Sequence, residues 1–174
     1  VLHLEPSKSE QDALRELHEI AKRNRQMDTF IGEGYYPVVT PGVIQRCVLE
    51  NPAWYTQYTP YQPEISQGRL ESLLNFQTMI QNLTGLPYAN ASLLDEGTAA
   101  AEAMAMAFAT RKDKGSRHFL VHAQVFEHTK ACIITRATAL GIEVVEFQRL
   151  PDDISEKKYF GILWQNPLSG GSVR

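Results

Sequence analysis

Apolar residues recur at helical spacing near the start of the chain. Leu14, Leu17 and Ile20 fall on one face, and charged residues fill the opposite face. Ser7 and Glu10 precede them as a Ser-x-x-Glu capping box, in which each side chain can accept a hydrogen bond from the other residue's free backbone N–H. The pattern predicts an amphipathic helix that begins within this box.

Three more helices are expected in the next part of the chain. One starts at Pro41, after a threonine hydroxyl cap, and ends before Pro52. Another covers residues 69–84, with Gly85 in the position of a left-handed cap. The last covers residues 98–111, and its many alanines and methionines predict a helix that is buried on more than one side.

The final third of the chain carries strand signals. The β-rich runs are Phe119–Val121, Ile142–Phe147 and Tyr159–Trp164. A predicted helix over Glu127–Leu140, ended by Gly141, separates the first two. This alternation predicts an α/β fold with a parallel sheet. A sheet of three strands would leave an uncovered edge. We therefore expect the chain to self-associate and to hold only part of a larger domain.

Residues 52–68 combine prolines with aromatic side chains. The prolines are expected to exclude a helix from this segment. Two interpretations of this segment remain open, because either one would bury the aromatic rings and leave their polar tips available. The segment either extends over a core with its hydroxyls in water, or it lines a functional site. Its aromatic residues are Trp54, Tyr55, Tyr58 and Tyr61.

Composition excludes several classes of protein. The 174 residues are 43% hydrophobic and 21% charged, which is typical of a folded domain. The net charge of −3 comes without a basic run, so neither nucleic acid nor a membrane is an expected partner. Cys47 and Cys132 are too few for a cysteine-based zinc site, and no metal is expected. Both lie among apolar residues and are expected to be buried, reduced thiols.

Residue spacing alone supplies no complete catalytic set. The chain has neither a phosphate-binding loop nor a nucleophile elbow. His122 and His128 could meet a ligand after the first strand, although a solvated or core histidine is the more common case. Asp95 and Glu96 open the alanine-rich helix, where acids favour the helix dipole and would repel a phosphate. Capping is therefore their expected role.

Several sequence blocks together resemble one known family. The most specific is ENPAWYTQYTPYQPEISQGR at residues 50–69, followed by ANASLLDEGTAAAEA at 89–103. Shorter blocks are FIGEGYY at 30–36, NFQTM at 75–79, TGL at 84–86, TRA at 135–137 and QNP at 165–167. The chain resembles, over nearly its whole length, the N-terminal half of the P-protein of the glycine cleavage system, glycine dehydrogenase (decarboxylating).

This resemblance implies a fold and a chemistry. Family members adopt the aspartate-aminotransferase-like fold (fold type I), decarboxylate glycine with pyridoxal phosphate (PLP), and pass the aminomethyl group to the lipoyl arm of the H-protein. It implies that residues 69–174 form an incomplete PLP-transferase-like large domain. Residues 1–68 would precede it as N-terminal helices and an extended aromatic segment. The implied location is the bacterial cytoplasm, or alternatively the mitochondrial matrix.

The resemblance also implies candidate site residues in the aromatic segment. Tyr58, Tyr61, Gln62 and Glu64 are the expected contacts to the substrate or to the carrier protein. Phenol and amide groups can hydrogen-bond a small carboxylate.

Two departures from the family concern the cofactor. Many members have Cys-His-Pro-Gln-Thr where this chain has VFEHT at 125–129, so Phe126 replaces a histidine that stacks on PLP in the catalytic half. Phe126 could stack but cannot hydrogen-bond. Thr98 is the other candidate cofactor contact, yet Glu96 beside it opposes a phosphate. Both departures predict that this chain does not bind PLP itself.

The resemblance places the lysine that forms the PLP Schiff base in the other half of the enzyme. The lysines here lie in polar contexts and are expected to be solvated: Lys8, Lys22, Lys112, Lys114, Lys130, Lys157 and Lys158. The expectation is therefore a piece of a P-protein that is inactive alone. The alternative is a non-catalytic interaction piece that docks on a PLP-bearing P-protein half or on another copy.

Overall fold

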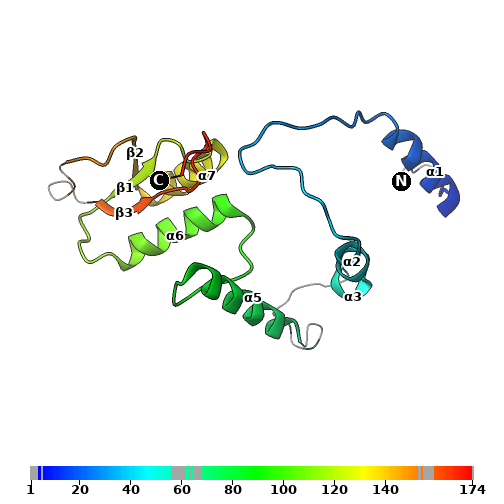
Figure 1. The fold of residues 1–174 in the computed structure, drawn as a ribbon, viewed down its shortest axis with the longest axis horizontal. Helices are drawn as coiled ribbons and strands as arrows, with labels where there is room; N and C mark the ends of the chain where they lie inside the picture. The colour runs from blue at the N-terminus through cyan, green and yellow to red at the C-terminus, as the bar shows by residue number, and fades with distance from the viewer. Residues whose placement is uncertain are drawn as a thin grey trace. The chain divides into compact units, whose positions relative to one another are not determined.

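The structure is a computed structural model that describes residues 4, 6–55, 62, 64, 68–152, 154 and 159–173. The chain divides into two compact units, Val1–Val38 and Val39–Arg174 (Figure 1). The second unit contains the sheet and the buried core.

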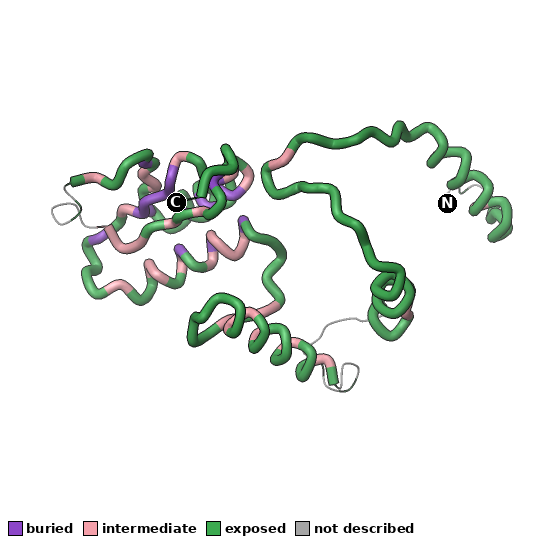
Figure 2. Tube along the Cα trace, viewed as in Figure 1, coloured by how far each residue is buried: buried purple, intermediate pink, exposed green. Residues whose placement is uncertain are grey.

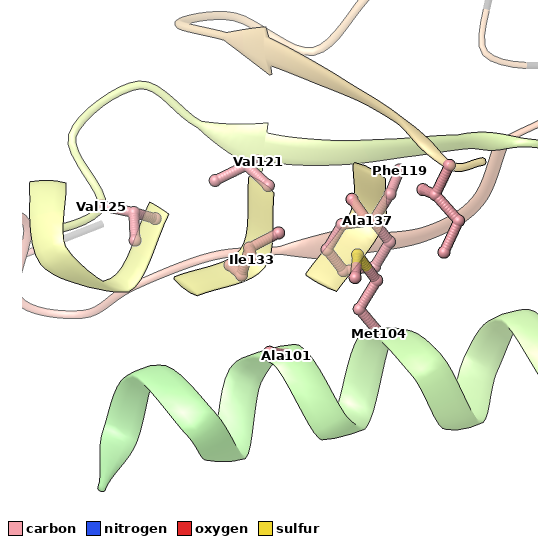
Figure 3. Packing of buried hydrophobic residues seen from close by; sticks show 8 residues of the cluster. Ala101, Met104, Phe119, Val121, Val125, Ile133 and Ala137 are labelled. Atoms are coloured by element: carbon pink, nitrogen blue, oxygen red, sulfur yellow. The ribbon is translucent and has the colours of Figure 1, made fainter. Parts of the chain in front are cut away.

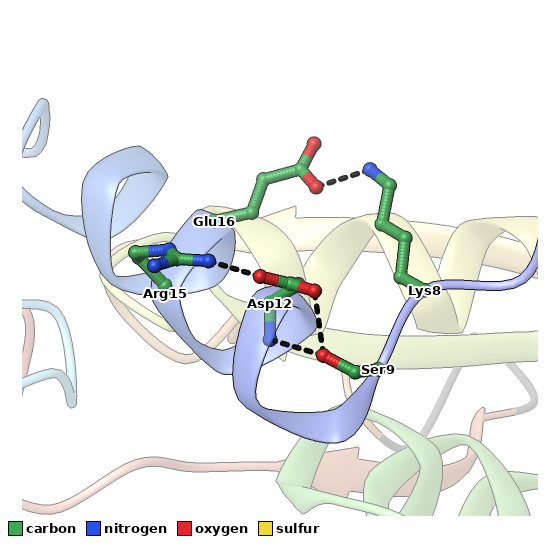
Figure 4. A network of polar contacts seen from close by, with 5 residues as sticks. All are labelled: Lys8, Ser9, Asp12, Arg15 and Glu16. Carbon is green, nitrogen blue, oxygen red and sulfur yellow. Dashed lines mark hydrogen bonds and ion pairs between the residues drawn. The ribbon is translucent and has the colours of Figure 1, made fainter.

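The first unit contains one regular helix, α1 (Glu10–Ala21). Its N-cap is Ser9, whose hydroxyl accepts a hydrogen bond from the Asp12 N–H at 3.1 Å. The capping box predicted at Ser7 and Glu10 is therefore wrong. Ser9 and Asp12, two residues further along and with the same spacing, cap the helix instead. Ion pairs from Lys8 to Glu16 and from Arg15 to Asp12 extend this network (Figure 4).

The second unit opens with short helical segments. These are α2 (Gly42–Ile44), a π-helical turn η1 (Gln45–Leu49) and α3 (Pro52–Tyr55). Pro41 is the N-cap of α2 and no side chain caps it, so the predicted threonine cap is wrong. The exclusion of a helix after residue 52 is also wrong for α3, because proline fits the first position of a helix and the Asn51 side chain accepts a hydrogen bond from the Ala53 N–H.

Two longer helices confirm their predicted positions. Helix α5 (Arg69–Thr84) ends at Gly85, whose φ of +72° is the left-handed conformation expected of a cap glycine. Helix α6 (Glu96–Thr110) lies within two residues of its predicted range and packs against both a neighbouring helix and a strand. Its buried residues, Gly97, Ala101 and Met104, lie at helical spacing on one face and Met106 is 67% exposed, so the predicted burial on more than one side is wrong.

Within the described residues, the sheet has three parallel strands in the order β2-β1-β3. They are β1 (His118–His122), β2 (Glu143–Phe147) and β3 (Tyr159–Leu163), with α7 (Glu127–Leu140) as the crossover between β1 and β2. These elements confirm the predicted α/β fold, because each lies within two residues of its expected position.

Helices α6 and α7 enclose the main core against the sheet (Figure 3). Met104 of α6 and Ile133 of α7 are fully buried there, next to Phe119 and Val121 of β1. Side chains alternate along a strand, so Leu120 and His122 face the other side. Figure 2 shows that burial is concentrated in this part of the second unit.

Both cysteines are exposed, which corrects the expectation of buried thiols. Cys47 lies on η1, which packs on α2 and α3. These two helices are too short to cover the Cys47 side chain. Cys132 lies on α7, whose buried residues are Thr129, Lys130, Ile133 and Ala137, so Cys132 is outside the buried face of the helix. Among the described residues, no helix is both long and apolar enough to cross a membrane, and no group of three or more potential metal ligands occurs.

Candidate functional site

A hollow of about 230 Å³ lies where the carboxyl ends of β1 and β3 meet the N-terminus of α6. In α/β sheets, ligands bind beyond the carboxyl ends of the strands, so this is the place where a site is expected. The hollow is lined by Glu96, Ala100, Val125, Phe126, Thr129, Leu163, Trp164 and Gln165.

Gln165 ties the two strand ends together at this hollow. Its Oε1 accepts a hydrogen bond from the Phe126 N–H at 3.0 Å, and its Nε2 donates to the Pro167 carbonyl at 2.9 Å. The Phe126 ring stacks on His128, with centroids 5.6 Å apart and planes 18° from parallel. These contacts hold the Phe126 ring at the rim of the hollow.

Two carboxylates occupy the N-terminus of α6. Asp95 Oδ1 accepts a hydrogen bond from the Thr98 N–H at 2.7 Å, which lowers the pKa of Asp95 below its usual value. The pKa of Glu96 is also lowered, first by a hydrogen bond from its own backbone N–H and then by His128, whose Nε2 lies 2.8 Å from Glu96 Oε1. The predicted capping role is confirmed for Asp95, and both groups are ionised at neutral pH.

These residues do not fit the phosphate of a PLP cofactor. The Thr98 N–H that a phosphate would use already binds Asp95, and Glu96 places a second negative charge beside it. No lysine lines the hollow in the described part of the chain.

Lys130 is buried, which corrects the expectation of a solvated side chain. Its ammonium binds Glu127 at 2.7 Å, Glu146 at 3.3 Å and the Ala123 carbonyl at 3.1 Å. Glu127 first, and then Glu146, raise the pKa of Lys130 despite its burial. An amine held in its protonated form by two carboxylates is not a nucleophile.

Phe126 and Glu96 line the same hollow. Thr98 lines a neighbouring groove between α6 and α7, together with Cys132 and Thr135. Gln62 and Glu64 are exposed, and Tyr58 and Tyr61 lie outside the described residues.

Trp164 and Gln165 were not predicted as site residues from the sequence. Both line the hollow directly after β3. A polar amide immediately after an apolar strand was the available signal, because the end of a parallel strand is where binding groups gather in α/β folds.

The folded state is expected to lose stability in acid through Asp95 and Glu96. Their pKa values are lowered on folding, so their contribution is present above the unfolded pKa values and is lost as the pH falls through the folded ones. In an Asp95→Asn, Glu96→Gln double variant, residue 95 can still cap the helix, but neither side chain takes up a proton in acid. Its urea midpoint should fall less than that of the unaltered chain between about pH 6 and about pH 3. Equal pH dependence of both proteins would contradict the assignment.

The parallel sheet with α6 and α7 places the chain in the α/β class, and a solved structure narrows this to fold type I of the PLP-dependent enzymes. A family model described as glycine cleavage system P-protein matches residues 1–174. The chain belongs to the glycine cleavage system P-protein family.

The solved structure is glycine decarboxylase (P-protein) of the glycine cleavage system in an inhibitor-bound form, similar with a TM-score of 0.83 and 31% identity. The match covers 99% of this chain and 40% of that one. Glycine dehydrogenase (decarboxylating) from Thermosynechococcus vestitus is 51% identical over 99% of this chain and 18% of its own length. The enzyme from Gluconobacter oxydans is 57% identical over 95% of this chain and 17% of its own length. The chain therefore spans less than a fifth of these curated relatives.

Proposed function

We propose that this chain is part of a glycine dehydrogenase (decarboxylating), which takes carbon dioxide from glycine and passes the aminomethyl group to the lipoyl arm of the H-protein. The observation that carries the proposal is the match of every residue to the P-protein family, together with 51–57% identity to enzymes of that name. The proposed setting is the bacterial cytoplasm, since these relatives are bacterial.

In this proposal the chain contributes structure and contacts, while PLP is held elsewhere in the enzyme. The misfit at the α6 N-terminus and the protonated state of Lys130 support this division. Tyr58, Tyr61, Gln62 and Glu64 remain the proposed contacts to the substrate or carrier. Residues 1–68 and 69–174 remain the proposed arm and incomplete large domain.

A second candidate function is a non-catalytic piece that docks on a PLP-bearing P-protein half or another copy. The observation that favours it is the exposed apolar stripe of α1, where Leu14, Leu17 and Ile20 are each at least half exposed. Large exposed apolar surfaces mark interaction sites in folded proteins.

The chain alone is expected to show no exchange of bicarbonate carbon into glycine when PLP and H-protein are supplied. Exchange should appear when the catalytic P-protein half is added, because the cofactor lysine is proposed to lie there. The measurement is incorporation of labelled bicarbonate into glycine. Exchange by the chain alone would contradict the proposal, and a complex with the catalytic half that stays inactive would favour the non-catalytic alternative.

A matched pair of variants tests the proposed contacts in the reconstituted enzyme. Gln62→Ala should lower the exchange rate, whereas Gln148→Ala changes another exposed glutamine just beyond β2 and should leave the rate unchanged. Equal rates for both variants would remove Gln62 from the proposed site.

A further inference from the structure

We propose that the exposed apolar surface of α5 is the surface on which the catalytic half of the P-protein docks. The proposal rests on the proposed function for the identity of the partner, and adds to it the surface that the partner contacts. This surface, called the α5 surface below, consists of a leucine-lined groove and a neighbouring stripe of larger side chains. Its members are Leu70, Leu73, Leu74, Phe76, Met79 and Leu83.

Helix α5 is apolar on more than one side and yet lies open to solvent. Phe76, Met79 and Leu83 recur at the spacing of one helix face, and the last two are 51% and 76% exposed. No residue of α5 is buried, and Figure 2 shows the helix exposed along most of its length. A helix with so wide an apolar surface is normally covered in the working protein.

The stretch that contains this helix lacks charge. Residues 72–94 include no Asp, Glu, Lys, Arg or His. Depletion of charged residues, with Phe and Met present, is typical of the buried centre of a protein–protein interface. Apolar interfaces of this kind belong to permanent complexes more often than to transient ones. The composition therefore favours a lasting structural partner.

A groove of about 400 Å³ runs between α5 and the segment that follows it (Figure 1 shows the position of α5). It is lined by Leu70, Leu73, Leu74, Gln77, Asn90, Ala91 and Ser92. Apolar and uncharged polar side chains thus form the whole described lining. Such a groove fits an apolar anchor side chain of a partner, and anchors in pockets contribute much of the binding energy of interfaces.

The P-protein relatives supply polypeptide that can cover this surface. The solved P-protein has a similar fold over 99% of this chain, and the match takes up only 40% of that protein's chain. More than four-fifths of the Thermosynechococcus vestitus enzyme likewise lies outside the match, since 18% of it is covered. In the proposed function the catalytic half lies in this remainder, which makes it the occupant of the α5 surface.

The test is calorimetric titration of the full chain with the catalytic P-protein half. Leu74→Lys in the groove and Met79→Lys in the stripe should each weaken the complex at least about tenfold, because a charge would be buried without a partner. Both side chains are more than half exposed, so the circular dichroism spectrum should be unchanged. The affinity of the unaltered chain should be nearly the same at about 0.05 M and about 0.5 M salt, since no charges meet.

Met106→Lys is the matched control, because Met106 is an equally apolar side chain on α6 with 67% exposure. It should bind the catalytic half as the unaltered chain does. No complex, equal losses for Met79→Lys and Met106→Lys, or a steep fall in affinity with salt would overturn the proposal. A dimer of the chain alone that Leu74→Lys separates would assign the surface to a second copy and also overturn it. A complex that Leu74→Lys weakens, but that exchanges no bicarbonate carbon into glycine, would support the docking surface and contradict the proposed function.

Discussion

A Met104→Ala variant is expected to lose about 2–5 kcal/mol of unfolding free energy, as other buried Met-to-Ala changes do. Met104 has no exposed surface and lies in the core formed by α6, α7 and β1. Truncation would remove its apolar contacts and leave a cavity, because the neighbouring side chains of Phe119 and Ile133 are themselves fixed by packing. Single domains have only about 5–15 kcal/mol of stability, so the loss is a large share.

The measurement is urea unfolding followed by circular dichroism. Met106→Ala is the matched control, since Met106 lies on the same helix but is 67% exposed. Alanine has slightly higher helix propensity than methionine, so this variant should keep or slightly raise the urea midpoint. Equal losses for Met104→Ala and Met106→Ala would mean that α6 does not pack on the sheet as described.

A Gly161→Ala variant is expected to destabilise the chain by about 1–3 kcal/mol through overpacking. A Cβ atom at Gly161 in β3 would lie 2.8 Å from Cε2 and 3.1 Å from Cδ2 of Phe119. The Phe119 ring cannot simply move away, because it is 5% exposed and lies 5.3 Å from the Phe160 ring. The pairing of β3 with β1 should weaken as a result.

Gly170→Ala is the control for this prediction, since a Cβ atom there has no neighbour within 4 Å. Its urea midpoint should stay close to that of the unaltered chain. A Phe119→Leu background should reduce the cost of Gly161→Ala, because the clashing ring atoms are then absent. An unchanged cost in that background would place the cause of the destabilisation elsewhere.

The N-terminus of α6 is occupied by carboxylates of the chain itself. The N-terminus of a helix normally favours an anion. Here Asp95 Oδ1 accepts a hydrogen bond from the Thr98 N–H at 2.7 Å, and Glu96 adds a second carboxylate on the next residue. Acidic side chains of the chain therefore take the position where an external anion would bind.

Local sequence signals predicted most of the regular elements. Helices α5 and α7 end at Gly85 and Gly141, both left-handed, because a glycine cap acts within its own turn. The three strands and their parallel direction followed from the alternation of β-rich runs with α7, whereas the order β2-β1-β3 came from the structure. The specific block at residues 50–69 and its companions pointed to the family whose model matches residues 1–174.

Only the tertiary structure decided which side chains meet. Glu96, Phe126 and Gln165 are far apart in the sequence, and they converge because the parallel crossover brings the ends of β1 and β3 to the start of α6. The burial of Lys130 and the exposure of Cys132 likewise depend on which face of α7 packs inward. The sequence by itself therefore determined the elements, their order and the family, since these depend on short-range patterns. Packing between distant elements decided the charge and shape of the hollow, since no short-range pattern encodes which distant residues will be neighbours.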